Sequence, residues 1–361
     1  MPERPLSDRS IYRARPTVRV DGSAHELVTQ LLVSMRMTEH EAGLSELELR
    51  FSNWRSRTDG SAGLAFEDER ILKLGASISV YGGDERTPQE IFRGKISAIE
   101  AEFSQSAPPE LVVLAEDALQ QSRMLRRTKL HRDVSIAAVA REIASRAHLR
   151  PVITDFDTNI GTQLQLNESD LAFLRRLLRA YDGDLQVVGE ELQVAARSRV
   201  QRETVNLALF SQLTRARVTA DLAEQTNAVT ASGWDPEQAQ RIAYTSHGSS
   251  LGPGSGRTGA DVLGQGFEAR SEHIGHVPVL TDADARAMAD AAYDQRARRF
   301  VLLEGRSDGN PALRVGTHAA VRGLSPRFDN VYYVVRVCHH FNLTEGYLTD
   351  FEAECAYLEV A

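Results

Sequence analysis

This chain of 361 residues has little of what several protein classes require. It has only two cysteines, Cys338 and Cys355, which are too few for a disulfide scaffold. No window approaches the ~20 apolar residues that span a bilayer, so we expect no membrane insertion. The first residues, MPERPLSDRSIYRARP, have no apolar stretch behind them and do not form a secretory signal. We therefore expect a protein made in a reducing cytoplasm.

Excess positive charge is also missing. Lys+Arg total 42 against 50 Asp+Glu, a formal net charge of -8, whereas a dedicated nucleic-acid binder must neutralise phosphates. We expect no sequence-specific nucleic-acid binding.

Aromatic residues are also few. They make up only 6%, with Trp54 and Trp234 as the two tryptophans, which offers little for a carbohydrate-binding platform. What is present, 42% hydrophobic and 25% charged residues, is typical of a globular protein of two or three domains.

Alternation of apolar and polar residues predicts strands in the first third of the chain. Leu47, Leu49 and Phe51 share one face of 46–52, and Val33, Met35 and Met37 alternate in the same way. Further strands are expected at 71–81, 91–103 and 111–115.

Helical spacing begins in the middle third. Asp133 is expected to cap a helix that reaches Ala147, and Ser169 a second helix that stops near Gly183. Thr281 is expected to cap a third helix that runs to about Arg299. The strands expected around these helices are 185–188, 192–195, 229–234, 313–321, 331–337 and 348–353. The Gly- and Ser-rich stretch 248–266 is interpreted as a long surface loop.

An internal repeat relates the first and last thirds. The segments 72–75 and 80–82 recur 241 residues later as 313–316 and 321–323. The same offset places Phe92 on Tyr333 and Ile96 on Val337, and after a loop shorter by three residues Ala115 falls on Ala353. We interpret this order of matches as two copies of one β unit, with an α/β piece inserted between them.

Two glycine motifs resemble sites found in enzymes. Residues 248–252 fit the G-x-S-x-G pattern of a hydrolase with Ser250 as nucleophile, but that serine needs a strand before it and a helix after it. The Gly/Pro-rich 252–256 that follows does not start a helix. Residues 252–258 resemble a phosphate-binding loop, although the spacing is one residue short and Arg257 replaces the lysine. We interpret both as composition of a Gly/Ser loop.

Metal-ligating residues gather only near the C-terminus, at Cys338, His339, His340 and Cys355. In a strand Cys338 and His340 share a face, and a hairpin turn at 342–347 would place Cys338 opposite about Phe351. Cys355 would then lie ~13 Å further along, too far for a shared zinc or a disulfide. We predict no catalytic, cofactor-binding or metal-binding residues.

A basic stretch, 122–150, leaves two interpretations open. It holds eight Arg and Lys residues against Asp133 and Glu142. These charges either dock an acidic partner, or they pair within the chain or face solvent.

The segment NESDLAFLRRLL at 167–178 resembles the hub proteins of contractile tails and injection systems, meaning phage late control protein D and the N-terminal part of VgrG proteins. Three other stretches agree in the family's order. They are the preceding helix at 134–149, a strand-ending turn at 233–236 and the closing segment at 312–352. The resemblance covers nearly the whole chain and is weakest before Ser122.

The resemblance implies a mainly β fold with an α+β insertion. It places a first barrel-like tube domain at 1–122, an α/β insertion at 123–206 and a second tube domain at 207–361, with a loop-helix insertion at about 240–300. Such hubs are homotrimers in which six similar units form a pseudo-six-fold ring. The ring adapts a three-fold spike to a six-fold inner tube.

The implied partners are a separate spike protein, an Hcp-like inner tube protein or tube initiator, and other baseplate proteins. A separate spike is expected because VgrG proteins continue into an OB-fold and a spike, whereas this sequence stops at Ala361. Assembly in the bacterial cytoplasm and a place in the baseplate of a phage virion or injection particle follow. We expect no enzyme and no cofactor. The alternatives are a hydrolase that uses Ser250 and an envelope-binding tail accessory.

Overall fold

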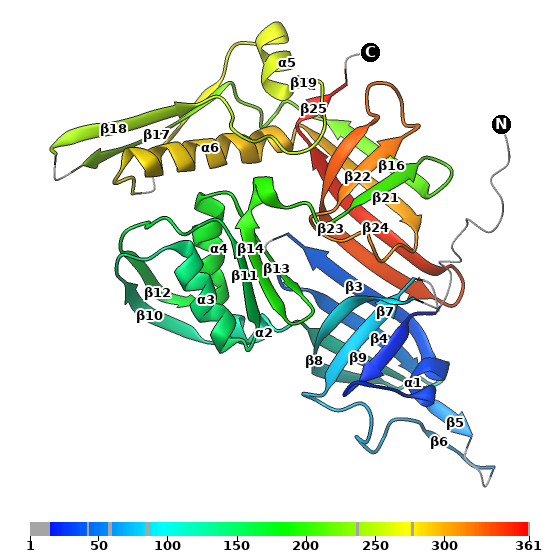
Figure 1. The fold of residues 1–361 in the computed structure, drawn as a ribbon. Coiled ribbons are helices and arrows are strands. Elements are labelled where there is room, and N and C mark those ends of the chain that lie inside the picture. Colours follow the sequence, from blue (N-terminus) through cyan, green and yellow to red (C-terminus); the bar gives the residue numbers. More distant parts are fainter. Residues whose placement is uncertain are drawn as a thin grey trace.

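The computed structural model describes residues 15–41, 43–56, 60–83, 87–235, 238–275 and 278–359. Residues 1–14, where we expect no secretory signal, lie outside the described residues. Thirteen strands join in one sheet that runs through two β units, and an insertion and a helical arm lie beside it (Figure 1). No helix of the described part is long and apolar enough to cross a membrane.

The two β units are built from corresponding strands. The first contains β1 (Thr17–Val20), β2 (Ser23–Ala24), α1 (Glu26–Leu31), β3 (Leu32–His40), β4 (Glu46–Ser52), β7 (Ser77–Gly82), β8 (Gln89–Glu102) and β9 (Glu110–Glu116), with a side hairpin of β5 (Trp54–Ser56) and β6 (Ala62–Leu64). The second contains β15 (Thr204–Ala208), β16 (Leu213–Ala220), β21 (Val301–Asp308), β22 (His318–Arg322), β23 (Asn330–Asn342) and β24 (Gly346–Cys355).

Strand order confirms the predicted repeat. The first unit is ordered β3-β4-β9-β8-β7-β1 and the second β16-β21-β24-β23-β22-β15. Only the last strands differ in direction, because β1 is antiparallel to β7 whereas β15 is parallel to β22. Both first strands carry a bulge at the same place, between Leu32 and Ser34 in β3 and between Leu213 and Arg215 in β16. The predicted fold class, mainly β with two related barrel-like units and an α+β insertion, is confirmed.

The alignment of the two copies needs one correction. Ala115 pairs with Ile96, and Ala353 pairs with Val334, so these strands correspond at an offset of 238 residues. Ile96 therefore matches Val334, not Val337. The three-residue length change lies between β7 and β8, where the second unit has the shorter loop, and not after β8.

Three predicted strands also differ from the structure. The stretches 71–81 and 313–321 contain strands only at β7 and β22, because Gly75 (φ 79°) and Gly316 (φ 88°) form a turn before each strand. In β3 the bulge puts Leu32 in the core, where it is 1% exposed, and leaves Val33 outside the buried alternation.

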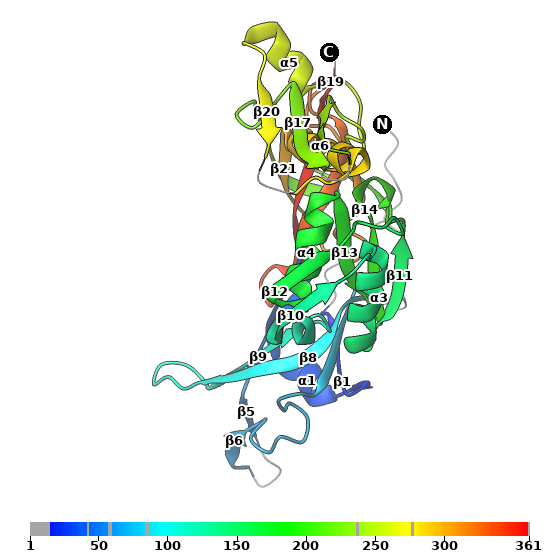
Figure 2. The same ribbon diagram turned by 90° about the vertical axis from the view of Figure 1, so that its left-hand side faces the viewer.

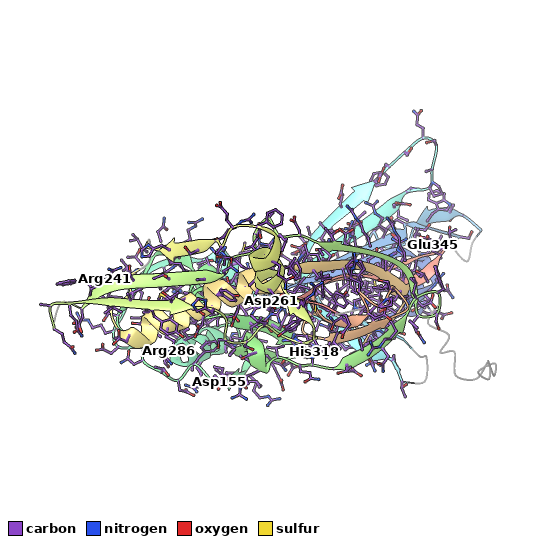
Figure 3. All side chains as sticks on the ribbon, turned by 90° about the horizontal axis from the view of Figure 1, so that it is seen from above. Asp155, Arg241, Asp261, Arg286, His318 and Glu345 are labelled. Carbon is purple, nitrogen blue, oxygen red and sulfur yellow. The ribbon has the colours of Figure 1, made fainter. Side chains whose placement is uncertain are left out.

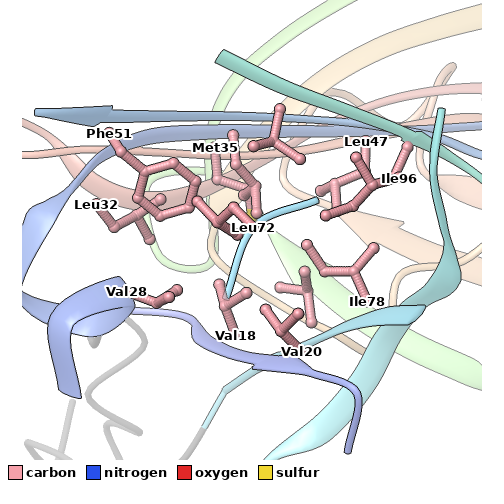
Figure 4. Packing of buried hydrophobic residues seen from close by; sticks show 14 of the residues in the cluster. Val18, Val20, Val28, Leu32, Met35, Leu47, Phe51, Leu72, Ile78 and Ile96 are labelled. Atoms are coloured by element: carbon pink, nitrogen blue, oxygen red, sulfur yellow. The ribbon is translucent and has the colours of Figure 1, made fainter. Parts of the chain in front are cut away.

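Each unit closes around its own apolar core. In the first, Val18, Val20 and Ile78 pack across from Leu47 and Phe51 (Figure 4). Two residues of the second unit, Phe341 and Tyr347, complete this first core. The units are therefore packed together and not merely tethered.

The insertion is a small α/β piece. Its elements are α2 (Gln120–Met124), β10 (Arg126–His131), α3 (Ile136–Arg146), β11 (Arg150–Thr154), β12 (Gln163–Ser169), α4 (Asp170–Ala180), β13 (Gly183–Val188) and β14 (Glu191–Ala196). Ser135 caps α3, not Asp133, which adopts the left-handed region (φ 47°) two residues before the cap. The chain turns at Asp182 (φ 52°) after α4, so Gly183 begins a strand instead of ending the helix.

The arm lies between β16 and β21 in the chain. It contains β17 (Ala228–Asp235), β18 (Gln240–Ser246), β19 (Arg257–Thr258), α5 (Gly259–Gly266), β20 (Ser271–Ile274) and α6 (Asp282–Arg298), and β19 pairs with the last strand, β25 (Tyr357–Leu358). The predicted cap Thr281 of α6 is confirmed. Arg241 on β18 and Glu345 in the β23–β24 turn lie near opposite ends of the molecule (Figure 3).

Ser169 is the predicted cap of α4, and its hydroxyl accepts a hydrogen bond from the Ala172 N–H at 3.2 Å. We expect Ser169→Ala to lower the free energy of unfolding by about 1 kcal/mol, the usual cost of an orphaned helix N–H. Chemical denaturation measures this. Ser145→Ala, on the exposed side of α3, is the matched control. Equal losses in both variants would contradict the capping role.

Candidate functional site

The Ser250 loop is held as structure. The N–H groups of Ser249 and Ser250 donate to the Asp294 carboxylate of α6 at 2.9 and 2.8 Å. Strand β18 precedes the loop, but the next helix, α5, begins only at Gly259. The strand–turn–helix geometry of a nucleophile elbow is therefore not formed at Ser250.

Two of the glycines of 252–258 are explained by close packing. A Cβ on Gly254 would lie 2.8 Å from Cys355 Sγ, and one on Gly256 would lie 2.0 Å from the Leu358 carbonyl oxygen. Ser255 N–H donates to Asn330 at 3.1 Å, so it does not point to a free anion site. The predicted loop ends early, because Thr258 and Asp261 form a capping box that starts α5 inside the expected loop.

The Cys/His group is divided between two faces of β23. Cys338 pairs with Asp350, one residue from the predicted Phe351, and Cys355 lies at the far end of β24 against Val301. Both thiols are free and buried. Within the described ranges no three His, Cys, Asp or Glu residues gather in a metal-binding geometry.

Most of the basic stretch pairs within the chain. The acidic partners are Glu116 for Arg123, Asp170 for Arg127 and Arg146, Glu142 for Lys129 and Arg146, Asp157 for Arg141 and Glu191 for Arg150. Of the two interpretations, intramolecular pairing accounts for these residues.

The tryptophans Trp54 and Trp234 are exposed but lie on separate hairpins. Pro236, at the end of the predicted turn after β17, lies outside the described residues.

One face of the shared sheet is rich in charged residues. Eight strands follow one another in the order β16-β21-β24-β23-β3-β4-β9-β8, and their core side is mainly apolar. The other side, which we call the charged face, carries Arg215, Arg217, Glu304, Arg306, Asp350, Glu352, Arg336, His340, Arg36, His40, Glu46, Glu48, Arg50 and Glu116. Sequence alternation identified polar positions on single strands but not that the two units place them on one surface.

Charges of both signs are mixed across this face. Arg306 binds Asp350 through two hydrogen bonds of 2.7 and 3.0 Å, and Arg336 binds Glu352 at 2.6 Å. Burial alone would raise the pKa of Asp350, but hydrogen bonds from His340 and Arg306 hold it below its ordinary value. The face is therefore mixed in sign, with two hollows along it.

The two units meet edge to edge. The second half of β23, from Arg336 to Asn342, pairs antiparallel with β3, from His40 to Ser34. Beneath this junction Arg314 binds Glu39 through hydrogen bonds of 2.9 and 2.8 Å, and the Val315 N–H donates to the same carboxylate. Burial would raise the pKa of Glu39, but Arg314 lowers it overall, so the buried carboxylate is charged.

A second buried ionic cluster fixes the insertion. Arg197, just after β14, contacts Glu41 beyond β3 and Glu354 on β24 (2.7 Å to the latter), and its guanidinium lies 3.0 Å above the ring of Tyr333. Arg298 on α6 joins Glu354 to Asp182. One cluster thus holds both β units, the insertion and the arm.

Solved structures show that this fold is known. The chain is similar to the 43 kDa tail protein of prophage MuSo2 from Shewanella oneidensis, with TM-score 0.69, 12% identity and coverage of 94% of this chain and 97% of that one. A tail protein from Neisseria meningitidis gives TM-score 0.65, 12% identity and coverage of 94% and 96%.

A third similar structure is the E. coli c3393 protein, a component of the type VI secretion system with structural similarity to the T4 bacteriophage tail proteins gp27 and gp5. It gives TM-score 0.61, 12% identity and coverage of 95% of this chain and 79% of that one. The predicted resemblance to tail and injection-system proteins is confirmed at the level of the fold.

Sequence comparison adds one family. No curated protein sequence matches the chain. The family model described as the Alg8 N-terminal domain matches residues 56–343, and the chain belongs to this family.

Proposed function

We propose that this chain is a structural hub of a contractile phage tail or injection system, that three copies form a ring, and that it is not an enzyme. The observation that carries the proposal is the junction of β23 with β3. Two similar units already join edge to edge inside one chain. If the same junction also forms between chains, the sheet continues from one chain to the next in a head-to-tail arrangement. Such an arrangement closes into a ring when the rotation from one unit to the next divides a full turn evenly.

The fold indicates which face such a ring would turn inward. The strands β7-β1 and β22-β15 pack over the two cores, on the side of the eight-stranded sheet opposite the charged face. This additional layer makes the core side bulkier, and the bulkier side of a curved sheet lies on the outside of a ring. The charged face therefore lines the channel. Three chains contribute about 24 strands, and at a spacing of about 4.8 Å the channel is roughly 40 Å across.

The proposed partners follow from the resemblance. A three-fold spike protein binds one end of the ring and an inner tube protein or tube initiator binds the other, with further baseplate proteins outside. The hub assembles in the bacterial cytoplasm and ends in the baseplate. Mixed charge on the channel wall suits passage without strong binding, because neither sign dominates.

Absolute mass in solution tests the proposal. Light scattering on a size-exclusion column is run on the chain alone and with the candidate spike protein. A mass near three times 39.9 kDa in either condition is expected. A soluble monomer that ignores the spike would overturn the trimeric hub.

A further inference from the structure

We propose that the second half of β8 pairs antiparallel with β16 of the next copy of this chain, in a register that places Glu102 opposite Arg217. This inference rests on the proposed ring and names the strands and residues that close it. The occupant of each edge is therefore a second copy of the same chain.

Both strands have an open edge within the described part of the chain. The second half of β8 pairs only with β9, because β7 pairs with β8 only as far as Lys95. Strand β16 pairs with β21 alone, apart from an isolated bridge between Leu209 and Leu213. The β8–β9 hairpin projects away from the body (Figure 2). Open edges of this length invite pairing with another chain.

The internal junction supplies the register. At the offset of 238, β8 corresponds to β23, and the shared bulge makes β16 correspond to β3. In the chain His340 lies opposite Arg36, and Cys338 lies opposite Thr38. The equivalent contacts between chains place Glu102 opposite Arg217 and Glu100 opposite Thr219.

An exposed aromatic residue marks the same junction. Phe103 directly follows β8 and is 67% exposed, yet its counterpart Phe341 is 5% exposed because it packs into the first unit beside Met35. Opposite Phe103 the next chain offers Ala216, which is only partly buried and is smaller than Met35. Phe210, three residues before β16, is 88% exposed and adds apolar surface at this edge. In the proposed junction Phe103 packs into the next chain in the same way as Phe341 packs into the first unit of its own chain.

The charges select this pairing over symmetric ones. The β8 edge carries Glu100 and Glu102, and the β16 edge carries Arg215 and Arg217. Pairing β8 with a second β8 would oppose like charges, and so would β16 with β16, which destabilises a sheet. Only the head-to-tail arrangement brings acid against base.

Cysteine pairs test the register. Opposite residues of an antiparallel pair have Cα atoms about 4.5–5.5 Å apart, which a disulfide can bridge. Under a mild oxidant, Glu102→Cys with Arg217→Cys is expected to give covalent dimers and trimers on a non-reducing gel. His340→Cys with Arg36→Cys is the positive control and closes within one chain. Glu102→Cys with Asp221→Cys, displaced by about 13 Å, is the negative control.

A charge swap gives an independent readout. Glu102→Arg is expected to shift the light-scattering mass from trimer toward monomer, and adding Arg217→Glu is expected to restore the trimer. Phe103→Ser is expected to weaken the trimer at least tenfold in dissociation constant, whereas Trp54→Ser, on the β5–β6 hairpin, leaves it unchanged. A trimer that shows neither the cross-link nor the swap overturns this register while the hub proposal stands. A chain that stays monomeric with and without spike overturns the hub proposal itself.

Discussion

Replacing Arg314 with methionine is expected to lower the free energy of unfolding by about 3 kcal/mol. The substitution leaves the Glu39 carboxylate, which is 1% exposed, without its bidentate partner at the junction of the two units. A buried charge that loses its partner typically costs about 3–5 kcal/mol. Arg314 itself is 19% exposed at its side chain, so the lower end applies. Chemical denaturation of the isolated chain measures the loss.

The matched control removes both charges. Glu39→Met with Arg314→Met replaces the ion pair by apolar groups of similar size and is expected to recover most of the lost stability. If the double variant is as unstable as Arg314→Met, packing and not the unpaired charge explains the loss. Glu39 has no ionic counterpart in β16, where Ala220 occupies the equivalent position. The internal junction is thereby locked by a buried ion pair that the proposed junction between chains lacks.

Local signals in the sequence predicted the regular elements well. The alternation that predicted a strand at 46–52 is the burial pattern of β4, because one face of that strand lies in the core and the other belongs to the charged face. Ser169 and Thr281 identified the starts of α4 and α6, because a helix cap depends on residues only three positions apart.

The same kind of local reasoning missed α5. Glycine and serine dominate 248–266, and composition favoured a loop throughout. The capping box of Thr258 and Asp261 was present in the sequence as a helix-start signal, and it outweighs the low helix propensity of the glycines that follow.

The junction of the two units could not be predicted from the sequence. Alternation tells which face of β23 is buried but not which strand lies beside it. The pairing of β23 with β3 is visible only in the tertiary structure. The repeat aligned at 241 matches Phe103 with Thr344, which hides its correspondence to Phe341. Only the strand pairing, at an offset of 238, relates the exposed aromatic to the buried one.

The buried histidine of β23 predicts a pH dependence. His339 is fully buried, and its Nδ1 lies 2.8 Å from the Tyr347 hydroxyl and 3.2 Å from that of Thr349. Burial and the nearby Arg314 lower the pKa of His339 from 6.5 to about 3. As the pH falls below about 6.5, His339 is therefore protonated in the unfolded chain but stays neutral in the folded chain. Stability is full above pH 6.5 and is expected to fall by about 2 kcal/mol at pH 5.

Two groups beside His339, Glu39 and Tyr347, do not titrate in that window. Arg314 holds the pKa of Glu39 below its ordinary value, and burial raises that of Tyr347, so the first stays charged and the second neutral from pH 7 to 5. His339→Gln keeps a polar side chain beside Tyr347 but cannot take up the proton. The substitution changes the free energy of unfolding at every pH by a similar amount. The change in that free energy between pH 7 and 5 therefore reports the contribution of the histidine. We expect the variant to lose about 2 kcal/mol less than the parent over this range. Equal slopes in the two proteins would show that the folded chain takes up the proton on His339 as readily as the unfolded chain does, which would contradict the lowered pKa of this histidine.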